Sequence, residues 1–460
     1  MRPPNQSARN QLMATLRRRP WSSAAELAAA LEVSVSTVHR LVREVPSGEL
    51  LASGNSRRTR YAARRALRGD AANLPLYEID AAGGATLLSQ LALVAPQGSL
   101  LPLQDTRWPT PEAARDGHWD GLPYPLHDMR PQGYMGRQLA QAEHRQLGVA
   151  QDPREWSDED VIFVLARVGF DVTGNLLLGN DSYDRWLRAK VTPSDPVAED
   201  QRGARYAALA QQAVAAGPVG SSAAGEFPKF TTARTRTAQA TPHVIVKFSG
   251  AGDNAAERRW ADLLVCEHLA LTHLAQMPGL ASARTDVVHY AGRTFLEVER
   301  FDRVGQHGRL PLCSLDALNL EFLGESTTEW PRLATRLHAM RLVDSETVRA
   351  IERLWWFGRL VANTDMHLGN LSFHPRTQLQ LAPAYDMLPM AYAPLAGGEV
   401  PPRAFDPPLP RPAQRDAWQA GCRSAIAFWQ DAGTDTRISA AFRATCMDNG
   451  RRLREIAALV

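Results

Sequence analysis

The uneven distribution of charge constrains the fold of this chain most, because it separates a short basic head from a long acidic body. Residues 1–68 contain thirteen arginines, no lysine and four acidic residues, a formal charge of +9. The remaining residues carry 39 basic and 45 acidic side chains, a charge of −6. Since single hydrophobic cores rarely exceed about 250–300 residues, a chain of 460 residues is expected to form several domains. The charge pattern predicts an anionic partner for the head alone.

The head has the pattern of a winged helix-turn-helix. Leucine and valine at helical spacing predict helices over 7–18, 22–31 and 35–43, with Ser22 or Ser23 capping the second. Residues 49–52, a Gly-Asn turn and residues 57–62 predict a β-hairpin, the wing. Two short helices about a tight turn, followed by a hairpin, are typical of DNA-binding modules.

Basic and polar residues coincide with the third helix and the wing, which favours DNA binding over a protein-docking domain whose arginines are merely solvated. The arginines are expected to contact phosphates, while Ser36, Thr37 and Arg40 are expected to read base edges. Such modules usually act as dimers, so a homodimer on DNA is a further expectation. The residues predicted to contact DNA are Ser36, Thr37, His39, Arg40, Arg43, Arg57, Arg58 and Arg60.

The stretch 71–215 has no recognisable chemistry and is expected to be a scaffold. It predicts a strand over 76–79, a helix or strand–helix junction over 84–93, and helices over 158–169 and 183–190. Residues 96–131 are rich in proline, glycine and tryptophan, so we expect them to wrap a surface.

A polar segment between two apolar ones, VANTDMHLGNLSF at 361–373, is the most specific chemical signal. Asp365 and Asn370 are five residues apart, the spacing between the base and the metal-binding asparagine of a kinase catalytic loop. A carboxylate there accepts the proton of an attacking hydroxyl, and an amide oxygen holds Mg²⁺ without adding negative charge. We expect a helix before this loop, a strand over 371–373, and His367 bracing the loop through its ring nitrogens.

Two further residues complete this pattern. Lys247 lies in HVIVKF (243–248), a predicted strand, and is expected to hold the phosphates of a nucleotide. An acid on the next helix is expected to pair with it; the candidates are Glu257, Asp262 and Glu267. Asp386, twenty-one residues after Asp365, is the candidate second metal ligand. The small residues and the lysine of 220–230 are a candidate phosphate-binding loop.

With these motifs in order, residues from about 215 to 460 resemble the HipA family of serine/threonine kinase toxins. The basic head resembles a subgroup of that family with an N-terminal helix-turn-helix, whereas the usual toxin relies on a separate DNA-binding antitoxin. Residues 133–139 (GYMGRQL) loosely resemble the family's N-terminal subdomain. The motifs that carry the resemblance are SSAAGEFPKF (221–230), HVIVKF (243–248), VERFDR (298–303), NTDMHLGN (363–370) and AYDMLP (384–389).

The resemblance implies ATP and Mg²⁺ as cofactors, Asp365 as catalytic base, and Asn370 and Asp386 as metal ligands. It implies a nucleotide-covering loop at 224–229, a hinge beside the adenine at 299–301, and autophosphorylation of Ser222, with Ser221 as a competitor. It also implies a protein substrate, in some relatives an aminoacyl-tRNA synthetase, an antitoxin partner and growth arrest. The implied nucleotide-binding residues are Ala224, Gly225, Glu226, Phe227, Pro228, Lys229, Lys247, Glu299, Arg300, Phe301, His367, Leu368, Gly369, Asn370, Tyr385 and Asp386.

The predicted fold class is α+β: a two-lobed, HipA- and protein-kinase-like body preceded by a small winged helix-turn-helix domain. The expected domains are 1–68, a scaffold at 71–215, a nucleotide-binding lobe at 216–310 and a helical lobe with the catalytic loop at 311–460. We expect no membrane segment, because no apolar run reaches about 18 residues. Four cysteines without a CxxC pair, and no secretory signal, favour a reducing cytoplasm.

Two alternatives remain open at the level of sequence. One is a small-molecule phosphotransferase, because those enzymes use the same Asp-x-His-x-x-Asn arrangement. The other is a DNA-binding regulator whose kinase-like body senses a nucleotide or a partner without transferring phosphate. A Mg²⁺-dependent nuclease lacks a recognisable motif in this sequence.

Overall fold

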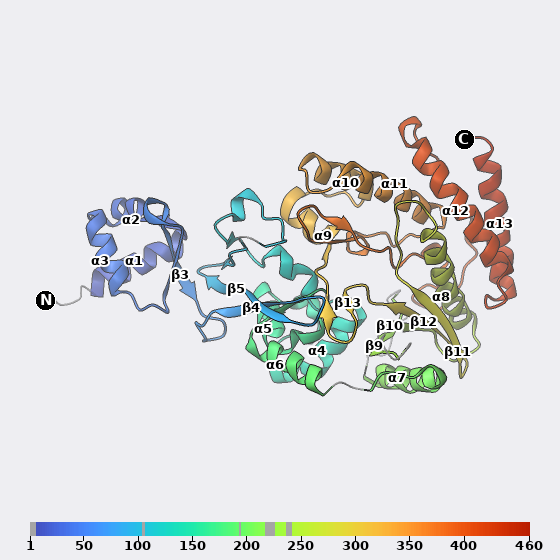
Figure 1. The fold of residues 1–460 in the computed structure, drawn as a ribbon, viewed down its shortest axis with the longest axis horizontal. Helices are drawn as coiled ribbons and strands as arrows, with labels where there is room; N and C mark the ends of the chain where they lie inside the picture. The colour runs from blue at the N-terminus through green and yellow to red at the C-terminus, as the bar shows by residue number, and fades with distance from the viewer. Residues whose placement is uncertain (1–5, 104–105, 193–194, 217–225, 236–241) are drawn as a thin grey trace.

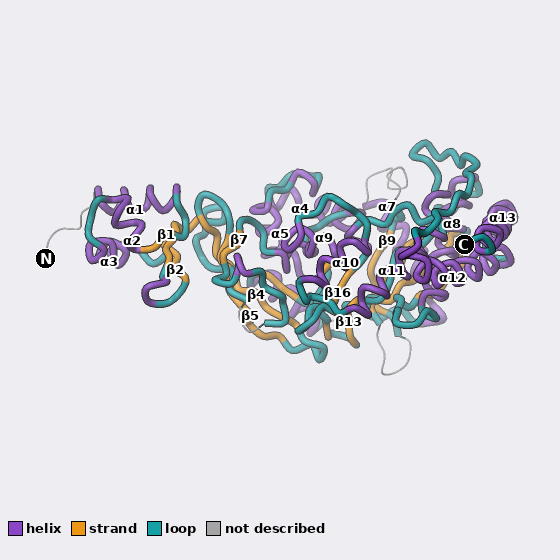
Figure 2. Tube along the Cα trace, turned by 90° about the horizontal axis from the view of Figure 1, so that it is seen from above, coloured by secondary structure: helices purple, strands orange, loops and turns teal. Residues whose placement is uncertain are grey.

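The computed structural model describes residues 6–103, 106–192, 195–216, 226–235 and 242–460. The molecule is elongated, with the head at one end and the C-terminal helices at the other (Figure 1). Seen from above, helices dominate that far end, while strands occupy the middle of the molecule (Figure 2). Of the predicted site residues, Ser221, Ser222, Ala224 and Gly225 lie outside the described residues.

The head forms the three predicted helices and the predicted hairpin. The helices are α1 (Gln6–Arg18), α2 (Ala24–Leu31) and α3 (Val35–Glu44), and Ser23 caps α2 in a capping box with Glu26. Leucines and valines at helical spacing form a core of their own between the three helices. The hairpin consists of β2 (Leu50–Ser53) and β3 (Arg60–Arg65), with a 3-10 turn at its tip, and β1 (Ser22–Ser23) pairs with β3.

The hairpin also joins the head to the middle of the chain, because β3 pairs with β5 (Ala85–Val94) through Arg64↔Val94 and Arg65↔Leu93. An antiparallel sheet runs β1-β3-β5-β4-β8, with β4 at Leu74–Ile79 and β8 at Leu176–Leu178. The prediction of a strand over 76–79 is confirmed. The prediction of a helix over 84–93 is wrong, because pairing with β4 on one side and β3 on the other fixes this leucine-rich segment as a strand.

Helices α4 (Gly133–Leu147), α5 (Asp158–Val168) and α6 (Asn180–Val191) surround this sheet, and the last two confirm the helices predicted there. The segment 96–131 contains the two-residue strands β6 (Ser99–Leu100) and β7 (His118–Trp119) and short 3-10 turns. It is largely irregular, as expected, but its Trp108, Trp119 and Tyr124 are buried. This segment therefore contributes to the main core and does more than wrap a surface.

A second antiparallel sheet has the order β11-β12-β10-β9, formed by β9 (Lys229–Ala233), β10 (His243–Phe248), β11 (Thr285–Tyr290) and β12 (Arg293–Glu299). Helix α7 (Arg202–Ala216) packs on one face, against Val244, Val246 and Phe248. Side chains alternate across a strand, so Lys247 points to the opposite face, towards α8 (Ala255–Leu274). By its packing, α7 belongs with this sheet, although we expected the boundary between domains after residue 215.

The C-terminal region consists of α9 (Leu315–Leu318), α10 (Trp330–Ala339), α11 (Ser345–Leu360), α12 (Arg415–Thr434) and α13 (Ala440–Ala457). A small sheet of β15 (Cys313–Ser314), β16 (Ser372–His374) and β17 (Gln380–Leu381) holds the chain after the polar segment. The helix predicted before that segment is α11, and the strand predicted after it is β16. The hairpin of β13 (Arg303–Val304) and β14 (Gly308–Arg309) follows β12.

All four cysteines are buried, and none forms a disulfide bond. Within the described ranges, each helix is too short or too polar to cross a bilayer.

Candidate active site

A cleft of about 1000 Å³ lies between the second sheet and the C-terminal helices, and the segment before α4 closes it from a third side. Most of the predicted site residues border this one cleft, although they come from five separate stretches of the chain. They are Glu226, Lys229, Lys247, Glu299, Arg300, Phe301, Asp365, His367, Leu368, Gly369, Asn370, Tyr385 and Asp386.

Lys247 joins the two lobes at the floor of the cleft. Its ammonium donates to both carboxylate oxygens of Glu267, at 2.7 and 2.8 Å, and also forms an ion pair with Asp386. Glu267 is therefore the acid that pairs with Lys247. The other two candidates act elsewhere: Asp262 accepts hydrogen bonds from Ser439, and Glu257 lies at the capped start of α8.

The electrostatics favour the ionised forms of Lys247 and Asp386. Burial disfavours the charged form of Lys247, but the carboxylates of Asp386 and Glu267 offset burial and raise its pKa. Burial likewise opposes ionisation of Asp386, but the Lys247 ammonium lowers the pKa of that carboxyl to about 2. Asp386 also has a left-handed backbone, with φ of 52°. Such conformations in residues other than glycine persist where the surroundings impose them, often at functional sites.

The polar segment 361–373 forms a braced loop at the edge of the cleft. The Asn370 side-chain NH₂ donates to the Asp365 carbonyl at 2.8 Å, and His367 Nδ1 accepts from the Gly369 N–H at 3.1 Å. The predicted bracing by a ring nitrogen of His367 is therefore present. Trp330 Nε1 donates to the His367 carbonyl at 3.3 Å. The Asp365 side chain itself is exposed and borders the cleft.

Asn363 was not predicted as a site residue, yet it joins the loop to the segment of Asp386. Its NH₂ group donates to the Asp386 carbonyl at 3.3 Å, and its oxygen accepts the Asp365 N–H at 3.0 Å. Tyr385 has a similar role, because its hydroxyl donates to the Gly369 carbonyl at 2.6 Å. The available sequence signal was the position of Asn363, two residues before the predicted base within one polar segment.

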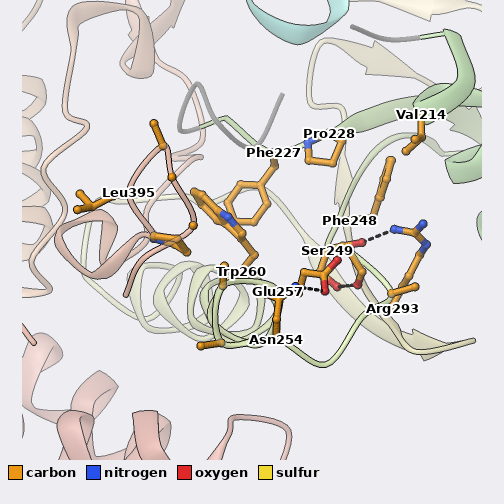
Figure 3. Close-up of a pocket in the computed structure, with 18 of the residues that line it drawn as sticks. Val214, Phe227, Pro228, Phe248, Ser249, Asn254, Glu257, Trp260, Arg293 and Leu395 are labelled. Carbon is orange, nitrogen blue, oxygen red and sulfur yellow. Dashed lines mark hydrogen bonds between the residues drawn. The ribbon is translucent and has the colours of Figure 1, made fainter. Parts of the chain in front are cut away.

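The predicted covering loop is only partly described, and its described residues split between two places. The Glu226 carboxylate accepts from the Tyr134 N–H and from Arg137, both at 2.8 Å, and pairs with Lys229 at 3.2 Å. Phe227 and Pro228, in contrast, line a separate cavity of about 790 Å³ (Figure 3). The Phe227 ring packs edge-on against Trp260, with centroids 4.8 Å apart, so these two residues do not border the nucleotide cleft as predicted.

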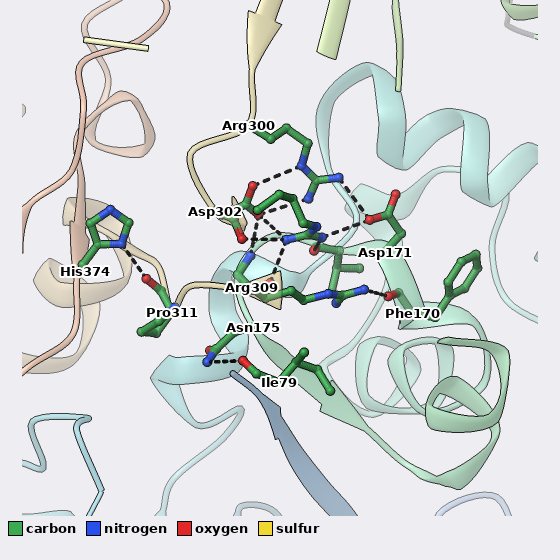
Figure 4. Close-up of polar contacts among 12 residues, drawn as sticks. Ile79, Phe170, Asp171, Asn175, Arg300, Asp302, Arg309, Pro311 and His374 are labelled. Atoms are coloured by element: carbon green, nitrogen blue, oxygen red, sulfur yellow. Dashed lines mark hydrogen bonds and ion pairs between the residues drawn. The ribbon is translucent and has the colours of Figure 1, made fainter. Parts of the chain in front are cut away.

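The predicted hinge also divides. Phe301 packs near Tyr385 in the cleft, with ring centroids 5.6 Å apart. Arg300 borders the cleft, but its guanidinium pairs with Asp171 and Asp302, each at 3.0 Å (Figure 4). Its side chain therefore serves an ion-pair network, while the residue itself stays at the edge of the cleft.

The donor set of the cleft fits Mg²⁺. Asp386 and Asn370 offer carboxylate and amide oxygens, and Mg²⁺ is usually held by one or two protein oxygens together with waters and substrate phosphates. No cluster of three or more His, Cys, Asp or Glu side chains suited to a metal occurs among the described residues.

Most of the predicted DNA-contacting residues lie on the surface of the head. Ser36, His39, Arg40 and Arg43 on α3 are exposed, and so are Arg58 and Arg60 near the hairpin tip. Two of the predicted base-reading hydroxyls already form hydrogen bonds within the head. The hydroxyls of Ser36 and Thr37 lie 2.8 and 2.9 Å from that of Ser34, the cap of α3.

Two of the predicted DNA-contacting arginines form contacts within the head. Arg60 donates to the Trp21 carbonyl at 2.9 Å, and Arg40 pairs with Glu44 at 2.8 Å. The side chain of Arg57 is outside the described part of the structure. Both bonded arginines are surface-exposed, and exposed ion pairs are weak enough to exchange for a phosphate.

Comparison with known proteins identifies relatives for most of the chain. Residues 70–187 match the model of the middle domain of YjjJ-like toxins, and residues 221–435 match that of the HipA-like C-terminal domain. The protein "Toxin YjjJ" of Escherichia coli K12 is 38% identical over 436 residues, 94% of this chain and 95% of that protein.

A solved structure shows the same fold at low sequence identity. It is a chain in the complex of HipA, HipB and operator DNA from a toxin–antitoxin system of Shewanella oneidensis MR-1. The match has a TM-score of 0.51 and 16% identity, and covers 84% of this chain and 99% of that one.

Proposed function

This chain belongs to the family of YjjJ-like, HipA-related toxins, and we propose that it is an ATP-dependent serine/threonine protein kinase that arrests growth. The observation that carries the proposal is the convergence of Lys247, Asp365, Asn370 and Asp386 on one cleft. An ammonium, a free carboxylate and two metal-type oxygens are the groups that phosphoryl transfer requires.

Each residue has a defined role in this proposal. Lys247, held by Glu267, neutralises phosphate oxygens, and Lys229 adds a second positive charge beside the cleft. Asp365 orients the substrate hydroxyl and accepts its proton as the new P–O bond forms and the bond to the leaving diphosphate breaks. Mg²⁺, held by Asn370 and Asp386, would supply charge neutralisation at the phosphates. Asn363 and Tyr385 keep the two loops in register.

Incorporation of phosphate from γ-labelled ATP tests the reaction. Asp365→Asn is expected to lower the rate by about 10²–10⁴-fold, the usual contribution of a general base. Asp416→Asn, which removes an exposed carboxylate from the start of α12, is the matched control and should leave the rate unchanged. Equal labelling of the parent and Asp365→Asn would contradict the assigned role of Asp365.

A cellular assay tests the toxin role and the substrate class. Expression of the parent is expected to stop growth, and expression of Asp365→Asn is not. Labelling of cell extract, followed by identification of the labelled proteins, tests whether the substrate is a translation factor such as an aminoacyl-tRNA synthetase. Relief of the arrest by the product of a neighbouring gene would support an antitoxin partner. Labelling of a metabolite but no protein would instead support a small-molecule phosphotransferase.

We also propose that the head binds DNA, paired with a second copy of the chain on a symmetric site. The exposed basic face of α3 and the adjoining hairpin supports this. Fluorescence anisotropy with duplex DNA at several salt concentrations tests it. Arg43→Gln is expected to weaken binding and to reduce the salt dependence by about one phosphate contact, whereas Arg349→Gln on α11 should not. DNA binding together with tight ATP binding and no phosphate transfer would instead favour a DNA-binding regulator whose kinase-like body only senses the nucleotide.

A further inference from the structure

A second charged cavity, of about 490 Å³, lies where β9, α6 and the β13–β14 hairpin meet. We call it the arginine pocket. Its charged lining residues are Asp171, Lys190, Arg300, Arg303 and Arg309, to which two histidines add polar groups. Four basic side chains thus face a single acidic one on the wall of this cavity.

The ion pairs behind the wall do not balance this charge (Figure 4). Arg300 and Arg303 both pair with Asp171 and Asp302, at 2.6 to 3.0 Å. These two carboxylates match the two arginines. Arg309 forms no ion pair with any residue that the structure describes; its Nη2 donates to the Phe170 carbonyl at 2.6 Å. The network as a whole keeps one uncompensated positive charge.

The guanidinium of Arg309 carries this uncompensated charge. It is 5% exposed, and its buried Nη1 finds no hydrogen-bond acceptor in the described ranges. Burying a charge without a partner is costly. Burial and the neighbouring Arg303 accordingly lower the pKa of Arg309 to about 9. An anion in the pocket would supply the missing charge.

We propose that the arginine pocket binds a phosphate group, either free or as the monoester of a small sugar. Guanidinium groups offer paired N–H donors that match phosphate oxygens. The volume lies within the range of about 300–1000 Å³ that is common for small-molecule sites and exceeds what a bare phosphate fills. Trp186 and Phe170 provide an apolar wall for the rest of such a ligand. This site is distinct from the candidate active site and does not depend on the proposed kinase activity.

Isothermal titration of the full chain tests the proposal. Inorganic phosphate and ribose 5-phosphate are titrated separately at constant ionic strength, with chloride replaced by the ligand. The ligand with the lower dissociation constant shows whether the pocket prefers free phosphate or a monoester. Arg309→Met is expected to weaken binding about tenfold or more, since hydrogen bonds to charged groups contribute on that scale. Arg349→Met, which removes the same charge from an exposed site, should bind like the parent.

Several results would overturn the proposal. They are no binding of either ligand by the parent, equal binding by the parent and Arg309→Met, or binding that Lys247→Met abolishes while Arg309→Met retains it. The last result would place the phosphate in the nucleotide cleft. If circular dichroism shows that Arg309→Met does not fold, Lys190→Gln on the cavity wall decides: weaker binding supports the proposal, and unchanged binding refutes it.

Discussion

Replacing Lys247 by methionine removes the ammonium of the central ion cluster while keeping a side chain of similar length. Glu267 has no exposed surface, and both of its carboxylate oxygens accept from Lys247. The variant leaves that carboxylate buried without a cation. Breaking a buried ion pair by removing one partner costs about 3–5 kcal/mol in free energy of unfolding. We expect a loss of this size near pH 8.

The loss should shrink at acidic pH. Burial raises the pKa of Glu267 in the parent although the Lys247 ammonium opposes this rise, so removing Lys247 raises that pKa further. A carboxyl whose pKa is higher in the folded state than its unfolded value of about 4.3 destabilises the folded protein as the pH rises between these two values. The difference between parent and variant should therefore grow by up to about 1.4 kcal/mol per pH unit between the folded-state pKa of Glu267 in the parent and its higher value in the variant.

Hydrogen exchange resolved by peptide measures the opening free energy of the segment that contains β10 and α8, at pH 5, 6, 7 and 8. The double variant Lys247→Met/Glu267→Met should recover much of the lost free energy, because position 267 then carries no buried charge. Arg349→Met is the control for the change in net charge. A loss below about 0.5 kcal/mol, typical of surface changes, or an equal loss at pH 5 and pH 8, would refute the description of a buried cluster.

Three further substitutions test the packing around the site. Asp302→Asn should lower the free energy of unfolding by about 3–5 kcal/mol at pH 7. Burial opposes ionisation of this carboxyl, but the two arginines that bind it lower its pKa, so the loss should shrink as the pH drops below about 4. Urea unfolding at pH 7 and pH 3 measures both values. Ser439→Ala removes the cap of α13 and a 2.6 Å bond to a buried carboxylate, and thermal unfolding should show a loss of about 1–2 kcal/mol that Ser439→Thr does not share. Gly308→Ala would place a Cβ 2.0 Å from the Ala81 carbonyl oxygen and should destabilise the protein by about 1–3 kcal/mol. Gly48→Ala is the control, because a Cβ at that position meets open space. Equal melting temperatures of the two variants would contradict the packing at Gly308.

The strand β5 shows where sequence patterns fail. Its leucines at 87, 88, 91 and 93 fit a helix as well as a strand, and leucine has a high helix propensity. The choice is made by partners outside the segment, β4 immediately before it and β3 further back in the chain, and pairing with both leaves Leu91 and Leu93 buried. Strand preference depends on such neighbours, so the local sequence was insufficient.

The candidate site was more predictable, because its most specific motif is local. Asp365 and Asn370 lie in one short loop, where spacing alone fixes their proximity. The partner of Lys247 was less predictable, because its three candidates on α8 point in different directions around the helix. Successive candidates are five residues apart and lie about 140° apart, whereas Glu257 and Glu267 lie about 80° apart. Which of them faces β10 depends on how α8 rotates against the sheet, and packing selects Glu267.

The hinge residues illustrate a related consequence of alternation along an extended chain. Glu299 ends β12, and the next two side chains point in different directions: Arg300 into the ion-pair network with Asp171, and Phe301 towards Tyr385 in the cleft. A nucleotide in the cleft would therefore meet the backbone of this segment and the Phe301 ring, but not the Arg300 guanidinium. Arg300 also borders the arginine pocket, so this one residue contributes to the walls of both cavities.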